Sequence, residues 1–157
     1  MASQANRFDD PRPGAPRPAP AQVFDFVAAT LRRGRMIRIE ATDGAMVPSV
    51  REGEWVTVQP AGAAEVHVGD VVLLSRGAVR YLRRVIEVEG GDNAPTGLIV
   101  RGDAADMVEP AELWRLLGRA VTVERHGKQV ELHADPRKLG VRVRLGAHRI
   151  GAWLLGD

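Results

Sequence analysis

Apolar and polar residues alternate with a period of two along much of the chain after Met36, and this pattern limits the possible fold more than any other feature. Residues 36–40 alternate over most of their length, as expected of a strand that buries one face. Further strand candidates, rich in Val, Ile and Leu, are residues 55–59, 70–75, 78–89, 97–101, 119–125 and 128–133. His126-Gly127 between the last two predicts a hairpin turn. Helical segments do not alternate with these runs, which favours an antiparallel sheet.

Two other segments have helical character. Residues 21–33 carry an apolar side chain at every fourth position, and Gly34 stands where such a helix would end. Residues 110–117 begin with Pro and are followed by Gly118, an arrangement typical of a short helix. The predicted fold class is therefore mostly β: a folded, antiparallel, barrel-like sheet with an N-terminal helix and one short internal helix.

The length of 157 residues is enough for one domain with a hydrophobic core and too short for two. Residues 1–20 are polar and Pro-rich, so we expect a disordered arm. Residues 21–135 would form the β domain, and residues 136–157 a basic C-terminal extension. Apolar residues alternate with Arg in this extension before Trp153 and its Leu neighbours. This pattern favours a strand and helix that close the core over a segment in contact with a membrane surface.

Composition excludes several classes of function. With no Cys and with four His that lack metal-ligand spacing, the chain is expected to hold no metal and no cofactor. The formal net charge of +2 gives little attraction for nucleic acid. The first residues contain no apolar run like that of a signal peptide. No apolar stretch approaches the ~18–20 residues of a membrane span. We therefore expect a cytoplasmic location in a bacterial cell.

Five short segments between residues 36 and 125 follow one another in a distinctive order. They are Asp43-Gly44-Ala45-Met46-Val47-Pro48-Ser49, Gly69-Asp70, Tyr81-Leu82-Arg83-Arg84-Val85-Ile86, Gly102-Asp103 and Gly118-Arg119-Ala120-Val121. The set resembles the type I signal peptidase and LexA-type repressor superfamily of serine peptidases. That pattern has Gly-x-Ser-Met-x-Pro, a Gly-Asp that opens a strand, Lys or His before Arg-Val-Ile, a Gly-Asp box and a closing Gly-Arg-Val strand. The resemblance implies the mostly β fold of that superfamily.

The resemblance also implies a catalytic pair, and this chain departs from it at both positions. In the family, the Ser before Met attacks the scissile carbonyl, and a neutral Lys or a His accepts its proton. The matching positions here are Ala45 and Arg83. A methyl group cannot attack, and a guanidinium stays protonated in proteins. Asp43 stands at the first Gly of the pattern, a lesser departure.

Other site residues follow from the same resemblance. The acidic box, Asp103 and Asp106, would orient a base; because no base is present, a turn formed by Asp and Gly is the favoured interpretation. A displaced nucleophile at Ser49 is disfavoured, because Lys128 and Lys138 both lie far along the chain. The groove that holds an extended peptide by strand addition in the family would be lined here by Gly44, Met46, Pro48 and Tyr81. Gly44 would allow a tight backbone approach.

Three functions remain open at this point. The leading hypothesis is a catalytically inactive, signal-peptidase-like domain that binds a peptide or protein partner without cleaving it. The second is an active serine endopeptidase in which Ala45 is an engineered or unusual replacement of the nucleophile. Arg83 favours natural loss, because a single engineered change would leave the base in place. The third is a regulatory or self-association module like the C-terminal half of the repressor. Residues 1–35 offer one helix, and a helix-turn-helix needs at least two.

Overall fold

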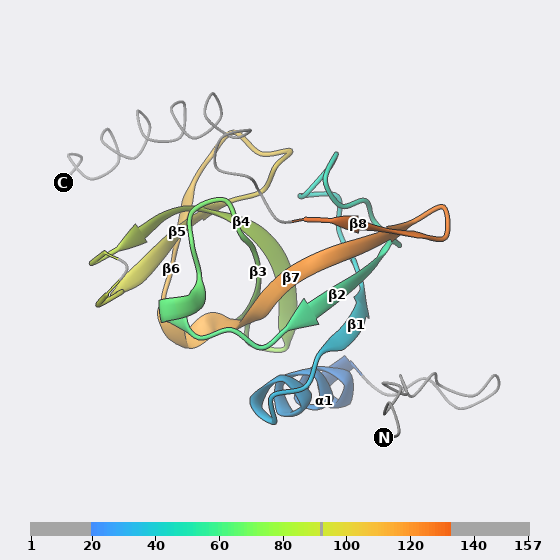
Figure 1. The fold of residues 1–157 in the computed structure, drawn as a ribbon, viewed down its shortest axis with the longest axis horizontal. Coiled ribbons are helices and arrows are strands. Elements are labelled where there is room, and N and C mark those ends of the chain that lie inside the picture. Colours follow the sequence, from blue (N-terminus) through green and yellow to red (C-terminus); the bar gives the residue numbers. More distant parts are fainter. Residues whose placement is uncertain (1–19, 92, 133–157) are drawn as a thin grey trace, which may run out of the picture.

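The computed structural model describes residues 20–91 and 93–132. Its strands form one eight-stranded sheet in the order β1-β2-β7-β3-β4-β5-β6, with β8 paired to β7 (Figure 1). All neighbouring strands are antiparallel. The strands are β1 (Ile37–Glu40), β2 (Trp55–Gln59), β3 (Val71–Arg76), β4 (Val79–Glu89), β5 (Gly97–Arg101), β6 (Glu109–Ala111), β7 (Leu116–Arg125) and β8 (Lys128–Glu131). The predicted mostly β, antiparallel class is confirmed. The sheet is not closed into a barrel, because β1 and β6, at the two ends of the strand order, do not pair with each other.

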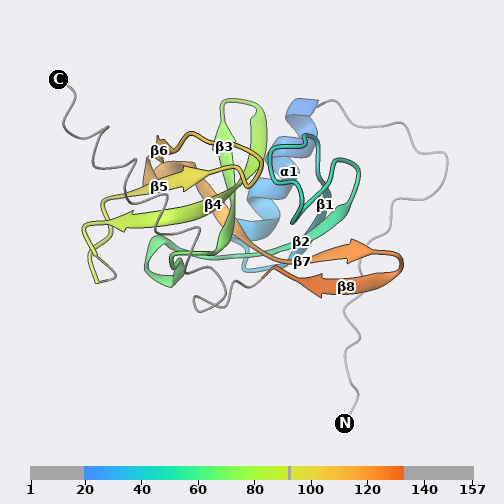
Figure 2. The same cartoon turned by 90° about the horizontal axis from the view of Figure 1, so that it is seen from above.

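The period-two pattern located the strands closely. The candidates at residues 55–59 and 97–101 coincide with β2 and β5, and the other five begin and end within three residues of the observed bounds. The hairpin turn is confirmed as well. His126 and Gly127 have φ values of +51° and +71°, the left-handed conformation that a two-residue turn between twisted strands requires. Figure 2 shows β7 and β8 as a ribbon joined by this turn.

The prediction of a helix at residues 110–117 is wrong. Glu109–Ala111 forms β6, Leu113–Arg115 makes a single 3-10 turn, and β7 begins directly after it. Pro110 is compatible with β6 because this strand lies at an end of the sheet, where a missing N–H removes no bond from a second neighbour. Pairing of β6 with β5 therefore decides the structure of this segment, and the local Pro and Gly signals do not.

The helix α1 (Pro20–Arg32) agrees with the predicted N-terminal helix and packs against β1 and β7. Val27 and Leu31 are buried in this contact. Burial of a side chain of this size contributes roughly 1.5–3 kcal/mol relative to exposure. Gly34, with a φ of +77°, follows the helix and allows the chain to turn into β1.

The two faces of the sheet bury separate apolar clusters. The first contains side chains from α1, β1, β2, β7 and the loop after β1, together with some from β3 and β4. The second contains other side chains of β3 and β4, and side chains of β5 and β6. Neighbouring residues of β4 point to opposite clusters: Leu82 belongs to the first, Tyr81 and Val85 to the second. Because β4 contributes to both clusters, side chains along it are held in place from both sides.

Parts of the predicted organisation fall outside the described residues. The expected arm at residues 1–20 lies outside them except for its last residue, and the extension at residues 136–157 lies wholly outside. Within the two described ranges, none of the helices has the length and apolar character needed to cross a membrane.

Candidate functional site

The loop between β1 and β2, residues 41–54, contains the segment that resembles the nucleophile motif. Met46 and Val50 anchor this loop, because both side chains are almost completely enclosed in the first apolar cluster. The Val50 amide donates to the Met46 carbonyl at 3.0 Å, so the two anchors belong to one turn. The Val47–Pro48 peptide bond between them is cis. Ala45 immediately precedes the first anchor, and the fold therefore determines its position.

An ion pair ties the end of this loop to β7. Arg125 donates to the Glu54 carboxylate from Nε at 2.7 Å and from Nη2 at 2.9 Å. The Nη2 group also lies 3.3 Å from the carbonyl oxygen of Ser49. The hydrogen bonds from Arg125 lower the pKa of Glu54 from 4.5 to about 2. At neutral pH this pair therefore holds the loop against the sheet.

The turn after β5 packs directly on position 45. The Ala104 amide donates to the Ala45 carbonyl at 2.9 Å. Gly102 is buried beside it, and a Cβ at this position would lie 2.6 Å from the Ala45 carbonyl oxygen. Only glycine permits so close an approach of the two backbones. The nucleophile-like segment and the Gly-Asp segment, far apart in the sequence, are thus in contact.

Acidic groups surround Arg83, the residue at the base position. Its guanidinium donates to Glu109 Oε1 at 3.2 Å and to the Leu82 carbonyl at 2.7 Å, and it lies 4.0 Å from Asp43 Oδ2. The other oxygen of Asp43 accepts a hydrogen bond from the Ala45 amide at 3.0 Å. One carboxylate therefore contacts both Ala45 and Arg83, the two positions that the resemblance assigns to a catalytic pair. A guanidinium held between two carboxylates remains a cation and cannot accept a proton.

The next residue, Arg84, forms a buried polar cluster with Asp103 and Ser49. Arg84 donates to both Asp103 oxygens, each at 2.7 Å, and to the Gly69 carbonyl at 2.7 Å. The Ser49 hydroxyl donates to Asp103 and accepts from Arg84 at 3.1 Å. The Asp103 side chain is only 4% exposed. Sequence reasoning missed Arg84, although its place beside Arg83 in the same segment was a usable signal.

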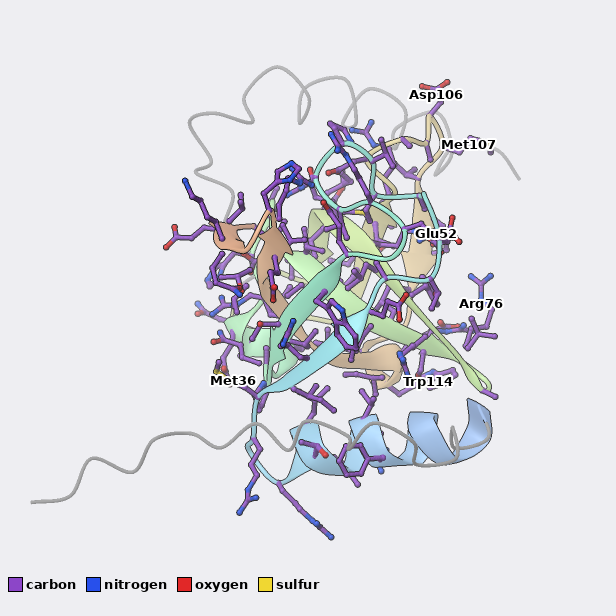
Figure 3. All side chains as sticks on the ribbon, turned by 90° about the vertical axis from the view of Figure 1, so that its right-hand side faces the viewer. Met36, Glu52, Arg76, Asp106, Met107 and Trp114 are labelled. Carbon is purple, nitrogen blue, oxygen red and sulfur yellow. The ribbon has the colours of Figure 1, made fainter. Side chains whose placement is uncertain are left out.

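Asp103 and Asp106 have different environments. Asp103 lies in a turn, as expected, and its carboxylate also holds the buried cluster with Arg84. Asp106 is exposed, and Figure 3 shows it beside Met107 at the outer end of its loop. Of the predicted acidic box, Asp103 therefore belongs to the buried cluster, while Asp106 is exposed on the loop before β6.

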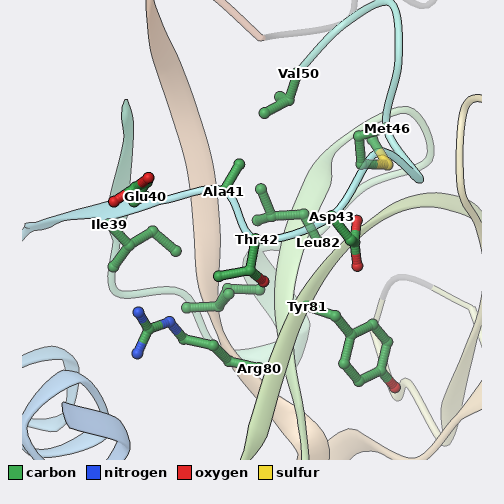
Figure 4. Close-up of a pocket in the computed structure, with 11 residues that line it drawn as sticks. Ile39, Glu40, Ala41, Thr42, Asp43, Met46, Val50, Arg80, Tyr81 and Leu82 are labelled. Atoms are coloured by element: carbon green, nitrogen blue, oxygen red, sulfur yellow. The ribbon is translucent and has the colours of Figure 1, made fainter. Parts of the chain in front are cut away.

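A shallow pocket lies between the loop after β1 and the first half of β4 (Figure 4). Its empty volume, including the open mouth, is about 330 Å³. Residues 39–43 form one wall, and Arg80, Tyr81 and Leu82 form the other. The floor is apolar and consists of Met46, Val50 and Leu73. The pocket thus offers an apolar base between two extended segments of backbone.

Two strands with an unpaired side border this pocket: β1, through Ile39 and Glu40, and the first half of β4. Among the described residues, β1 pairs only with β2. β4 pairs with β3 from Val79 onward, but with β5 only from Arg84. Residues 79–83 therefore have a strand neighbour on one side alone within the described part of the chain. An extended peptide can hydrogen-bond to such an edge while its side chains enter pockets below.

The predicted groove residues are only partly brought together. Met46 and Tyr81 line the pocket, whereas Gly44 and Pro48 are exposed and do not line it. A Cβ on Gly44 would meet nothing closer than a Val47 methyl at 3.9 Å. The close backbone approach expected at Gly44 occurs instead at Gly102.

Within residues 20–91 and 93–132, no cluster of three or more His, Asp or Glu side chains is arranged to hold a metal ion. Comparison of the chain with protein-family models and with curated proteins found no match.

Proposed function

We propose that this chain is a signal-peptidase-like domain that binds an extended segment of a peptide or protein partner and does not cleave it. The observation that carries the proposal is the pocket between the free sides of β1 and β4, which has an apolar floor and lies beside position 45. A peptide added there would extend the sheet from two sides at once.

Peptide binding is supported by the hydrogen-bonding requirements of sheet edges. A strand edge exposes backbone N–H and C=O groups that a parallel or antiparallel partner can satisfy. Side chains of an added strand point alternately up and down, so every second residue would face Met46, Val50 and Leu73. These floor residues are buried and apolar, which favours small apolar side chains at the inward positions.

Inactivity is supported by the chemistry around position 45. Ala45 supplies no nucleophile, and Arg83 supplies no base. Ser49, the serine nearest to Ala45 in the sequence, already donates a hydrogen bond to Asp103. Both oxygens of Asp103 accept hydrogen bonds from Arg84, so this carboxylate is a poor acceptor for the serine proton. These contacts weaken the hypothesis of an active peptidase that uses Ser49.

Titration of ¹⁵N-labelled protein with an extended peptide tests the proposal. The peptide should have small apolar residues at alternate positions, with both ends blocked. We expect amide shifts in residues 39–46 and 79–83. The matched control is the same peptide with proline at every other position, which removes N–H donors and should abolish the shifts. Shifts confined to other parts of the chain, or equal shifts with the proline control, would argue against strand addition in this pocket.

A further inference from the structure

Arg80 is a cation in the pocket wall, and it has no acidic partner within residues 26–91 and 93–132. It lies on β4, half-buried, and lines the pocket together with Ile39 and Glu40 (Figure 4). Its Nε atom is buried and makes no hydrogen bond, and no ion pair joins its guanidinium to an acidic side chain within residues 26–91 and 93–132. Arg80 therefore brings a half-buried positive charge into the wall of the groove.

The neighbouring arginines of the same strand differ in this respect. Arg83 pairs with Glu109, and Arg84 pairs with Asp103. A guanidinium that is removed from water without a partner is costly, and the usual compensation is a carboxylate. Burial lowers the pKa of Arg80 from its usual value. Arginine nevertheless remains charged, so Arg80 presents a permanent positive charge to whatever enters the groove.

We propose that the groove selects a peptide with an acidic side chain, whose carboxylate pairs with Arg80. The inference rests on the proposed function, because it assumes that a peptide occupies this pocket. The planar guanidinium can donate two parallel hydrogen bonds to one carboxylate. Asp43 does not oppose this selection, because Arg83 lies close enough to neutralise it. Glu40 is exposed to solvent, where its repulsion is screened.

The strand geometry also predicts the spacing of the recognised residues. Arg80 and Leu82 are two residues apart and lie on the same face of β4. A peptide paired alongside β4 advances by about 3.3 Å per residue, the same as the strand itself. An apolar residue near Leu82 and an acidic residue near Arg80 should therefore be separated by one residue. The expected recognition pattern is apolar-x-acidic or its reverse.

Binding of blocked peptides tests this inference. The probes are N-acetylated, C-amidated octapeptides that contain Leu-x-Glu or Glu-x-Leu, each compared with its Gln counterpart. We expect the Glu peptide of one orientation to bind about tenfold more tightly than its Gln counterpart. A third arm, the Gln peptides with a free C-terminus, distinguishes a side-chain carboxylate from a terminal one.

Three variants identify Arg80 as the cause of the preference. In Arg80→Gln the Glu and Gln peptides should bind equally, and in Arg80→Lys part of the preference should remain. Arg35→Gln removes an equal charge from an exposed position outside the pocket and should keep the full preference. Melting temperatures of the variants confirm that each is folded.

Each remaining outcome contradicts a specific part of the account. Equal affinity of the Glu and Gln peptides for the unchanged protein would overturn the selection by Arg80 and leave peptide binding intact. A preference only for the free C-terminus would overturn side-chain recognition. If the preference for Glu peptides persists in Arg80→Gln, another cation must recognise the carboxylate, and the role of Arg80 would be wrong. Failure of every peptide to bind would overturn the inference together with the proposed function.

Discussion

Replacement of Glu54 by Gln should loosen the loop that carries position 45. The pKa of Glu54 is lowered from 4.5 to about 2, mainly by the hydrogen bonds from Arg125. A shift of about 2.5 units corresponds to at most about 3.4 kcal/mol at 1.36 kcal/mol per unit. The side chains of Glu54 and Arg125 are 15% and 24% exposed, so solvent screening reduces this value. We expect Glu54→Gln to lower the free energy of unfolding by about 1–2 kcal/mol near neutral pH.

The pH dependence separates this ion pair from a packing effect. A carboxylate whose pKa is lowered in the folded state contributes its stability above its unfolded pKa, here 4.5, and loses it as the pH falls towards 2. Urea denaturation should therefore show a difference between the unchanged protein and Glu54→Gln that is largest near neutral pH and narrows between about pH 4.5 and 2. Glu112→Gln, at an exposed ion pair with Arg115, is the control and should change stability little. A pH-independent difference, or none near neutral pH, would refute the reasoning.

The site chemistry makes further predictions. Gly102→Ala should destabilise the fold by about 1–3 kcal/mol, because the new Cβ would press on the Ala45 carbonyl; an unchanged midpoint in urea would contradict the close packing of these two segments. Serine-directed acylating probes should not label the protein, and mass spectrometry that finds label on Ser49 would revive the active peptidase. Ala45→Ser should remain inactive in a peptide-cleavage assay, whereas Ala45→Ser combined with Arg83→Lys should gain measurable hydrolysis; robust cleavage by the single variant would show that Arg83 is not the obstacle. Deletion of residues 2–19 should leave the melting temperature almost unchanged, because a polar, Pro-rich segment offers little surface to bury, and a large decrease would show that this segment packs on the domain.

Seven of the eight strands could be predicted from the sequence, because each of the seven has its own local signal. Alternation marks β1, and a left-handed turn at His126-Gly127 marks the hairpin of β7 and β8. The error at residues 110–117 has the opposite origin. Pro110 can begin a helix or lie on an edge strand. The outcome depends on pairing with β5, and the local sequence around Pro110 does not reveal that pairing.

The site was less predictable than the fold because its contacts are long-range. Pairing of Arg84 with Asp103 joins residues on different strands and turns. The tight backbone contact was expected at Gly44 but lies at Gly102, since only the packing of two loops reveals which glycine is crowded. The place of Arg80 in the pocket wall depends on what surrounds it in space, and no motif in the sequence marks it.

Hydrogen–deuterium exchange followed by mass spectrometry, with an excess of the blocked apolar peptide, tests the central claim most directly. One set of spectra reports both amide protection in the protein and the mass of the peptide. The account predicts slower exchange in residues 38–43 and 79–83, together with a peptide of unchanged mass after prolonged incubation. Absence of protection in these residues, or the appearance of cleaved peptide, would contradict a groove that binds without cutting.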